Sequence, residues 1–528
     1  MKIQLTQFRG AIPKLRPQLV PAGSAQEAIN TAFDDGTLSP IQQASIAHTF
    51  DNVPADFVAH DGEFLPFSAK VWAAPGPVKA DRLYYCVDGS APKVRFEDDT
   101  VHDLAVDAPS APPAITLDYI EDDEDDPLPR ETIFMVYTFV TPFGEESLPS
   151  PVSDSVDIAE EQTAVIALPD NMPPTGSRID RMRIYRTQTS ASGVTEFYFI
   201  DEVNAGVASV AYDPAVQTMQ EVLPSADYDT PPTDLKGLTV LPNGFMAGFT
   251  GKTLCFSEPW QPHAWPIKYQ LQTEYDIVGL GVTGNLLAVL TTGTPYLAQG
   301  SAPDSVQLER QDMNLPCLSG DGIVDMGGSI AYPSPEGLVL LTSGSPQVVT
   351  GNTFTRKQWA AMNPASFDAA HTAGRYVFAY TPEGESAKLG VIDLTGAGRE
   401  FTRLTLTPGA MRYDLATGDL LMLSGDDVIR LDDREAGYMT LTWTSGQIMM
   451  PAPVSFGVAM IEGEALDDPD GFSATITRDG VDILTTSVMN EFFRLPDGLG
   501  TRWEIKVTGR VQIDRITIAG EPSDLYGG

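Results

Sequence analysis

The stretch IVGLGVTGNLLAVLTTGTPYL, residues 277–297, shows the pattern that recurs through most of this chain. A lead residue, Ile277, is followed by a strongly apolar run at 286–290, a glycine-containing turn and a third run at 295–297. Short apolar runs bounded by glycine and proline are typical of β-strands joined by tight turns. The stretch therefore predicts consecutive strands of one small sheet.

The same arrangement returns along the chain at a nearly constant period. The lead residues of the copies are Phe57, Leu238, Ile277, Ile323, Phe367 and Met411. The last four are separated by 46, 44 and 44 positions. A period in the forties with about four strands per copy is the signature of a β-propeller blade. Six candidate blades result, the first far upstream of the others, and a set of unrelated hairpins is the alternative.

Two other segments depart from this period. The first opens at a proline-rich joint, 108–113, and continues with alternating apolar runs such as 133–140 and 181–186. Several short strands at this spacing predict an inserted β-sandwich similar to a fibronectin type III domain. After about Leu441, alternation with period two, as at 502–507, predicts a separate C-terminal β-sandwich.

The expected fold is all-β: a six-bladed β-propeller with degenerate blades, an inserted fibronectin type III-like β-sandwich and a C-terminal β-sandwich. Long amphipathic windows are missing, so only two short helices are expected, at 25–33 and 355–362. The expected parts are an N-terminal arm at 1–45, a first blade at 46–112, the inserted sandwich at 113–235, the remaining blades at 236–440 and the C-terminal sandwich at 441–528.

Charge is the unusual feature of the composition. The sequence has 33 Lys and Arg against 72 Asp and Glu, a formal net charge of −39 at pH 7. A field of this sign repels phosphate backbones and disfavours tight or sequence-reading nucleic-acid binding, although solubility or a salty habitat explains the charge equally well. No apolar run is long enough to span a bilayer or to form a signal peptide, so we expect a soluble protein.

The usual motifs of catalysis and metal binding are missing. The five histidines are never within four residues of one another, and the three cysteines lie singly in apolar stretches, which predicts buried core thiols. The acid-rich turn at 467–471 lacks the further glutamate of a calcium loop and is interpreted as a plain turn. We therefore expect no catalytic residues, no metal and no cofactor.

Several motifs together resemble a known family. The string Phe8-Arg9-Gly10-Ala11-Ile12-Pro13, with Asn30 and Gly36-x-Leu38-x-Pro40, is similar to the opening of a widespread group of tailed-bacteriophage virion proteins. Further matches, running nearly end to end, are Tyr137-x-Phe139-Val140-Thr141, Gly144-Glu145-Glu146-Ser147-x-Pro149-Ser150-Pro151, Ile184-Tyr185-Arg186, Pro242-Asn243-Gly244, Phe256-Ser257-Glu258-Pro259, His263-Ala264-Trp265-Pro266, Arg494-Leu495-Pro496 and Trp503-Glu504.

The resemblance implies a structural tail protein similar to the tail tubular or nozzle proteins of short-tailed phages. In these, six propeller-containing subunits form a ring below the portal and adaptor, and DNA leaves through it. The expected protein is then a non-enzymatic hexamer of the virion, assembled in the host cytoplasm. Six copies would carry a charge of −234, so DNA would pass without specific binding. A receptor- or glycan-binding propeller of the virion is the alternative, and a propeller glycosidase is a third class.

Three groups of residues are candidates for function. The basic arm of Lys2, Phe8, Arg9, Lys14 and Arg16 either docks on an acidic neighbour or packs on its own chain. The acidic loop Glu121, Asp122, Asp123, Glu124, Asp125 and Asp126 is expected to be solvated. A loop with Trp260, His263 and Trp265 is either a sugar platform or, as favoured here, a rigid loop whose indoles fill a gap.

Overall fold

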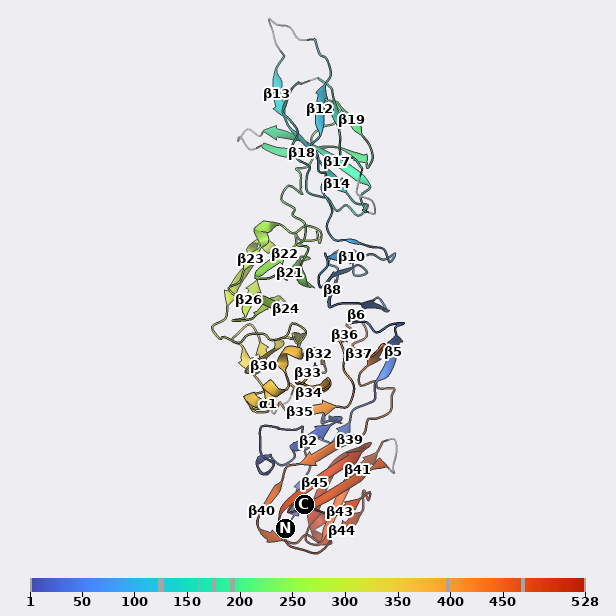
Figure 1. Ribbon diagram of the computed structural model, residues 1–528, viewed down its shortest axis with the longest axis vertical. Helices are drawn as coiled ribbons and strands as arrows, with labels where there is room; N and C mark the ends of the chain where they lie inside the picture. The colour runs from blue at the N-terminus through green and yellow to red at the C-terminus, as the bar shows by residue number, and fades with distance from the viewer. Residues whose placement is uncertain are drawn as a thin grey trace. The chain divides into compact units, whose positions relative to one another are not determined.

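The computed structural model describes residues 2–121, 128–160, 162–172, 177–189, 195–395, 399–466 and 471–526. The chain divides into two compact units. Unit 1 comprises Met1–Lys70, Tyr275–Gln299 and Leu308–Gly528, and unit 2 comprises Val71–Glu274 and Gly300–Gln307. Nearly all regular structure in the described ranges is β, which confirms the all-β expectation (Figure 1).

Unit 2 contains two antiparallel sheets of four strands each. Their strands are β8 (Val71–Pro75), β9 (Leu83–Val87), β10 (Lys93–Arg95) and β11 (Val101–Asp103), then β20 (Lys236–Val240), β21 (Met246–Thr250), β22 (Thr253–Phe256) and β23 (Leu271–Gln272). The first strands of these sheets, β8 and β20, contact each other.

Unit 1 contains four more sets of four consecutively paired strands. The first two sets are β24 (Ile277–Thr283), β25 (Leu286–Thr291), β26 (Tyr296–Gln299) and β27 (Gln307–Arg310), then β28 (Val324–Asp325), β29 (Ile330–Ser334), β30 (Gly337–Leu341) and β31 (Gln347–Val348). The other two are β32 (Asp368–Thr372), β33 (Arg375–Tyr380), β34 (Lys388–Asp393) and β35 (Phe401–Leu404), then β36 (Met411–Tyr413), β37 (Leu420–Ser424), β38 (Asp427–Arg430) and β5 (Ser45–Thr49).

The second strand of each set is apolar on both faces because it is covered on both sides. All six residues of β25 are buried, and β33 and β37 are nearly as enclosed. The first strands of successive sets in unit 1 contact one another in the order β24, β28, β32, β36. Six four-stranded sets therefore follow the period of the sequence, whereas their closure into one six-bladed propeller stays a prediction.

The first set differs from its expected composition. Phe57 lies in β6 (Asp56–His60), which pairs only with β7 (Glu63–Phe67), and the lead strand of the set is β8 instead. The reason is spacing, because a short turn at Asp61 and Gly62 closes β6 and β7 into their own hairpin. The preceding strand, β5, pairs with β38 and so joins residues 45–49 to the last set.

The inserted segment folds as a β-sandwich with one apolar core. Its three sheets have the orders β12-β16-β19, β13-β15 and β14-β17-β18. The strands are β12 (Ala114–Leu117), β13 (Arg130–Ile133), β14 (Met135–Val140), β15 (Val156–Ala159), β16 (Ala164–Ala167), β17 (Arg181–Thr189), β18 (Thr195–Asn204) and β19 (Ser209–Tyr212).

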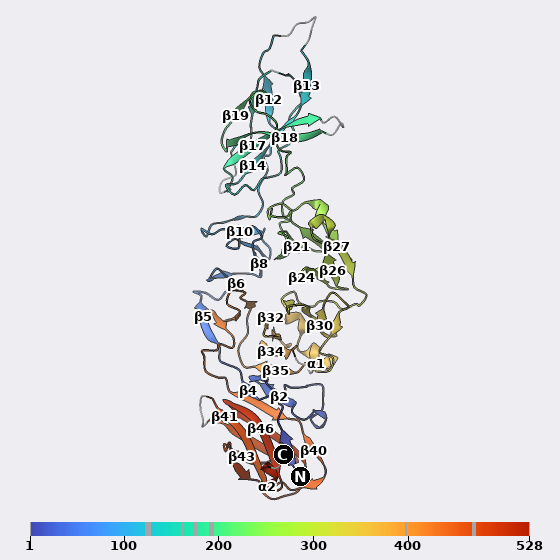
Figure 2. The ribbon, with the colours of Figure 1, turned by 180° about the vertical axis from the view of Figure 1, so that it is seen from behind.

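The C-terminal sandwich includes strands from the N-terminal segment. One sheet has the order β1-β46-β41-β44, and the facing one continues from β35 through β2-β39-β45-β42-β43, with β40 on β45. Figure 2 shows the blue strands β2 and β4 beside the red and orange strands of this sandwich. The strands are β1 (Lys2–Leu5), β2 (Ala25–Ile29), β3 (Thr31–Ala32), β4 (Ser39–Pro40), β39 (Leu441–Ser445), β40 (Ile448–Val454), β41 (Val458–Ala465), β42 (Ser473–Arg478), β43 (Val481–Thr486), β44 (Phe492–Arg494), β45 (Gly500–Gly509) and β46 (Val511–Ala519).

Helices are few and short. The helix expected at 355–362 is confirmed as α1 (Arg356–Ala361), where Thr355 accepts from the Gln358 amide and the Gln358 side chain caps in return. The helix expected at 25–33 is wrong, because residues 25–29 form β2, which pairs with β39 in the same sheet. The others are α2 (Pro522–Tyr526) and the 3-10 turns η1 (Pro17–Leu19), η2 (Ile267–Tyr269), η3 (Pro303–Ser305) and η4 (Pro364–Ser366).

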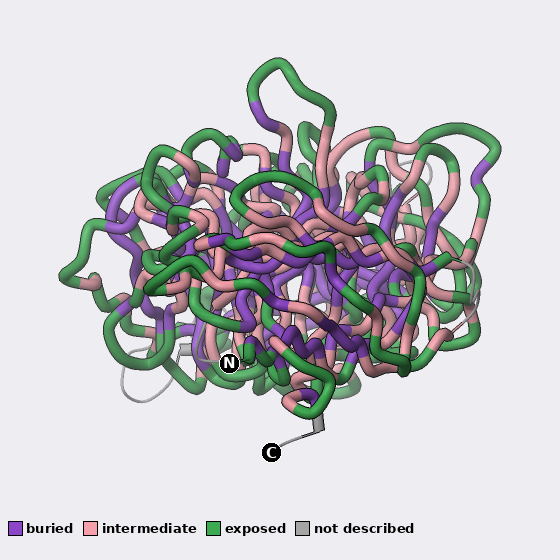
Figure 3. Tube along the Cα trace, turned by 90° about the horizontal axis from the view of Figure 1, so that it is seen from below, coloured by how far each residue is buried: buried purple, intermediate pink, exposed green. Residues whose placement is uncertain are grey.

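Figure 3 shows exposed stretches mostly on the outer turns of the trace and buried stretches mostly inside. Cys86, Cys255 and Cys317 are buried free thiols, as expected, and burial raises the pKa of each to about 12. Among the described residues, no helix is long and apolar enough to cross a membrane.

Candidate functional site

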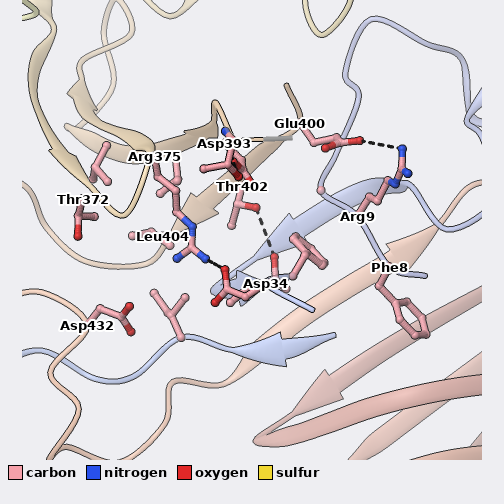
Figure 4. A pocket seen from close by; sticks show the side chains of 18 of the residues that line it. Phe8, Arg9, Asp34, Thr372, Arg375, Asp393, Glu400, Thr402, Leu404 and Asp432 are labelled. Carbon is pink, nitrogen blue, oxygen red and sulfur yellow. Dashed lines mark hydrogen bonds and ion pairs between the residues drawn. The ribbon is translucent and has the colours of Figure 1, made fainter. Parts of the chain in front are cut away.

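A cavity of about 400 Å³ in unit 1 lies where the N-terminal segment crosses the sheet β32–β35. Residues 7–10 and 31–36 form one wall, and β33, β34 and β35 form another. Figure 4 shows charged side chains at both ends of the cavity. The polar residues in its lining include Arg9, Thr31, Asp34, Thr372, Arg375, Asp393, Thr395, Glu400, Thr402 and Asp432.

The arginines of this cavity already have acidic partners. Arg375 forms an ion pair with Asp34, and Arg9 Nη1 lies 3.9 Å from Glu400 Oε1 (Figure 4). Burial raises the pKa of Glu400, and Arg9 opposes that shift. Asp34 and Arg9 belong to the N-terminal segment, whereas Arg375 lies on β33 and Glu400 directly precedes β35. The two ion pairs therefore connect the N-terminal segment to the sheet.

The cavity offers no reactive arrangement among the residues that line it. Its lining holds no cysteine and no histidine. Across the described ranges of the chain, no group of three His, Cys, Asp or Glu residues is placed to hold a metal ion. The expectations of no enzyme activity and no cofactor stay predictions, and we describe the cavity as a joint between chain segments.

A second group of charges lies among the first strands of unit 1. Lys70 forms an ion pair with Asp321, which precedes β28, and Arg412 on β36 pairs with both carboxylate oxygens of Asp56. Asp368 at the start of β32 accepts from the Met411 amide at 3.2 Å. Burial raises the pKa of Asp368 and lowers the pKa of Lys70 from 10.5 to about 8. Four chain segments are thus joined by charges that are mostly half-buried.

This low pKa predicts a pH-dependent stability difference between the wild type and Lys70→Met. Above pH 8 the folded state has released the amine proton, whereas the unfolded chain holds it until about pH 10.5. Unfolding then takes up a proton, so wild-type stability should rise relative to the variant by about 2 kcal/mol between pH 8 and 9.5. Urea denaturation across this range measures it, with Lys357→Met on exposed α1 as control. A difference that does not change with pH would contradict the prediction.

The Gly144-Glu145-Glu146-Ser147 motif forms a buried joint within unit 2. Glu145 Oε2 lies 3.0 Å from Arg178 Nε, with both side chains 7% exposed. Arg178 also donates to the carbonyl of Asp103 at 2.9 Å, which ties the insert to the sheet β8–β11. His263, after β22, bonds through Nε2 to the carbonyl of Glu146 at 3.0 Å. The motif therefore joins the inserted sandwich to both neighbouring four-stranded sheets.

The serines that follow this motif complete an edge of the insert. Ser147, Ser150 and Ser153 recur at every third position, and each donates its amide to a carbonyl of β14. Each hydroxyl accepts in turn from a β14 amide, at 2.9 to 3.1 Å. Proline has no amide to donate, so the three serines before, between and after Pro149 and Pro151 supply the bonds that an ordinary strand would make.

The basic arm lies partly within its own chain. Phe8 is 1% exposed and packs edge-on against Trp443, with ring centroids 5.2 Å apart. The Lys14 ammonium donates to the carbonyl of Gly351. Together with the ion pair of Arg9, these contacts support the alternative in which the arm packs on its own chain.

The other two arm residues remain at the surface. Lys2 is exposed on β1, and Arg16 is exposed at the start of η1. Docking of the arm on an acidic neighbour stays a prediction. Lys2 and Arg16 are the arm residues whose exposed side chains would make that contact.

The structure separates the three residues of the aromatic loop. Trp265 is 1% exposed and donates from its indole to the carbonyl of Pro262 at 2.8 Å, and His263 is 3% exposed. Both fill space, whereas Trp260 is 56% exposed. In the acidic loop, Glu121 is exposed, and Asp122 to Asp126 lie outside the described residues, as do Asp467 to Asp470 of the acid-rich turn.

For two groups of residues, the sequence contains no pattern that would predict the contacts they make. The charges around Lys70 come from segments up to 356 positions apart, so no local spacing reveals them. Asn30 belongs to the N-terminal motif, but its role depends on bonds to residues near 405 and 440.

Comparisons with known proteins give no family. No family model and no curated protein matches the chain. One similar solved structure is the extracellular domain of a B. thetaiotaomicron protein described as a hybrid two-component system, with 8% identity and a TM-score of 0.22 over 82% of this chain and 44% of that one. Another is puromycin hydrolase, with 12% identity and a TM-score of 0.23 over 76% of this chain and 61% of that one. The chain thus spans less than two thirds of either, and TM-scores this low establish no shared fold.

Proposed function

We propose that the chain is a structural component of a phage tail: a ring protein of the nozzle or tubular type, below the portal and adaptor, that forms part of the DNA-ejection conduit. Its partners would be further copies of itself, most simply in a hexamer, and adjoining tail proteins. Genomic DNA would pass without specific binding.

The location of the motif residues carries this proposal. Phe8, Asn30, Glu146 and Trp265 belong to the motifs on which the phage resemblance rests, and all four are at most 4% exposed. They join sheets to one another, whereas the motif residues of an enzyme family surround a reactive cavity. The shared motifs therefore describe an architecture, which is what a structural family has in common.

The distribution of charge agrees with a conduit. The segment 113–235 contains 24 acidic and five basic residues, a net charge of −19 and about half of the total. Wherever such a surface faces duplex DNA, it repels the phosphates within a Debye length of about 8 Å at physiological salt.

Light scattering of the purified chain tests the assembly. We expect a mass about six times 56.9 kDa, more fully populated near 0.5 M than near 0.05 M salt, because salt screens the repulsion between acidic subunits. Negative-stain images of that species should show a closed ring with an opening. A mass of 56.9 kDa under both conditions would contradict assembly of the chain by itself.

A further inference from the structure

Trp260 is exposed in a chain that buries most of its tryptophans. Its side chain is 56% exposed, whereas Trp265, Trp359, Trp443 and Trp503 are each at most 1% exposed. A large aromatic side chain normally stabilises a protein by being buried in the core. The exposed Trp260 ring does not contribute in this way, so its exposure suggests another role.

The backbone at Trp260 is in a conformation that favours glycine. Trp260 is the third residue of a turn closed by the Gln261 amide, which donates to the Glu258 carbonyl at 3.1 Å. The φ of Trp260 is +60°. Pro259 is the second residue of this turn, and turns with proline second and a positive φ at the third residue usually have glycine there. Such conformations persist where the surroundings enforce them, and they concentrate at binding and active sites.

The neighbouring turn of Asn243 and Gly244 fixes the ring. The Trp260 amide donates to the Gly244 carbonyl at 2.7 Å. A Cβ placed on Gly244 would lie 2.4 Å from Cδ2 and Cε2 of the indole, so the ring rests against the glycine backbone. One face of the indole is therefore covered by the Gly244 turn. This contact fixes the orientation of the exposed face in the absence of a ligand.

Polar residues follow Trp260 in the chain and lie in a segment bonded to the neighbouring turn. The side chain of Gln261 is half-buried and makes no hydrogen bond within the described part of the chain. The Asn243 side chain donates to the Ser301 carbonyl at 2.9 Å, which places the exposed residues Ser301 and Asp304 in a segment tied to the turn beneath the ring. The segments joined at this turn thus carry an exposed indole together with amide, hydroxyl and carboxylate side chains.

We propose that Trp260 is the stacking platform of a carbohydrate site that takes a neutral pyranose ring. The C–H face of the sugar would lie on the open face of the indole, and its hydroxyls would bond to Gln261 and the neighbouring polar groups. A subunit contact centred on tryptophan has well-packed apolar neighbours. The residue that follows Trp260, Gln261, and the segment bonded at Ser301 to the neighbouring turn are polar instead. The site goes beyond the tail-ring function and does not depend on it.

An array of neutral oligosaccharides, built from glucose, galactose, mannose and N-acetylhexosamines, tests the site with the full chain. We expect the wild type to bind at least one of them. Titration of the same free oligosaccharide should show at least a tenfold loss of affinity in Trp260→Ala and in Gly244→Ala, whose Cβ displaces the ring. Gln261→Ala should lose about fivefold. Ile267→Ala, which removes an exposed apolar side chain seven positions after Trp260 in the chain, should stay within twofold.

Trp260→Ala and Gln261→Ala alter surface side chains, so the test does not depend on whether Gly244→Ala folds. Absence of binding by the wild type to every oligosaccharide would overturn the proposal, as would equal binding by Trp260→Ala. A lower assembly mass of Trp260→Ala, with no sugar bound by the wild type, would show a subunit contact instead and would equally overturn it.

Discussion

Replacing Glu146 by alanine is expected to lower the free energy of unfolding of unit 2 by about 4 kcal/mol, because it removes one partner of a buried charged network. Glu146 Oε1 accepts from the Thr138 hydroxyl at 2.7 Å and from the Tyr185 hydroxyl at 2.6 Å. Its other oxygen lies 3.4 Å from Arg183 Nη1, and the residue is 4% exposed. Alanine would leave both hydroxyls buried without an acceptor.

Glu221 provides a matched control, because it approaches the same arginine from the surface. Its carboxylate lies 4.0 Å from Arg183 Nη1, and its side chain is 57% exposed. Glu221→Ala should therefore change stability by less than about 1 kcal/mol. Chemical denaturation measures both variants, and hydrogen exchange should locate the loss in β14 and β17. Equal effects of the two substitutions would contradict the role given to the buried network.

The central strands of the repeating β sets were predictable because local sequence specifies them. In residues 277–297, an apolar run sits between glycine-containing turns, and the structure places it as the fully buried strand β25. The same reasoning identified α1, where Thr355 and Gln358 make a capping box within four residues. Local patterns of this kind need no information about distant segments.

Elements completed by distant strands were not predictable in the same way. Ala25–Ile29 has alanines at helical spacing, yet its backbone bonds to β39 more than 400 residues later. Pairing of this kind overrides local propensity, which differs by only about 0.7 kcal/mol per residue among ordinary residues. The predicted N-terminal arm shows the same effect, because Phe8 fills the sandwich core beside Trp443, a contact that no local pattern specifies.

The candidate functional residues also show the difference between features set by local sequence and features set by distant segments. The sequence identified Trp260, His263 and Trp265 as one group because they are close in the chain. Their separation into two buried residues and one exposed residue depends on the insert and on the Gly244 turn. The motifs behind the resemblance include Phe8, Asn30 and Glu146, but nothing in the motifs themselves indicates that these residues join sheets.

Asn30→Ala is expected to destabilise unit 1 by about 3 kcal/mol. Asn30 is 3% exposed, and its side-chain amide donates to the Thr405 hydroxyl at 3.0 Å and to the Thr440 carbonyl at 2.9 Å. Its side-chain oxygen accepts from the Thr405 amide at 3.0 Å. Alanine leaves buried backbone groups unpaired, at about 1–3 kcal/mol, and places a Cβ without compensating bonds at a φ of +53°, at about 1–2 kcal/mol.

Asn30→Gly separates these two causes, because glycine adopts the positive φ freely but makes none of the bonds. We expect Asn30→Gly to lose about 2 kcal/mol, so that the difference between the variants reports the backbone conformation and the remainder reports the bonds. Denaturation followed by tryptophan fluorescence measures both, since Trp443 lies in the same sandwich. The joint between β2, β35 and β39 depends on Asn30 only if hydrogen exchange accelerates first at residues 25–31 and 401–405. Uniform acceleration across unit 1, or wild-type stability of Asn30→Gly, would show that strand pairing alone holds this joint.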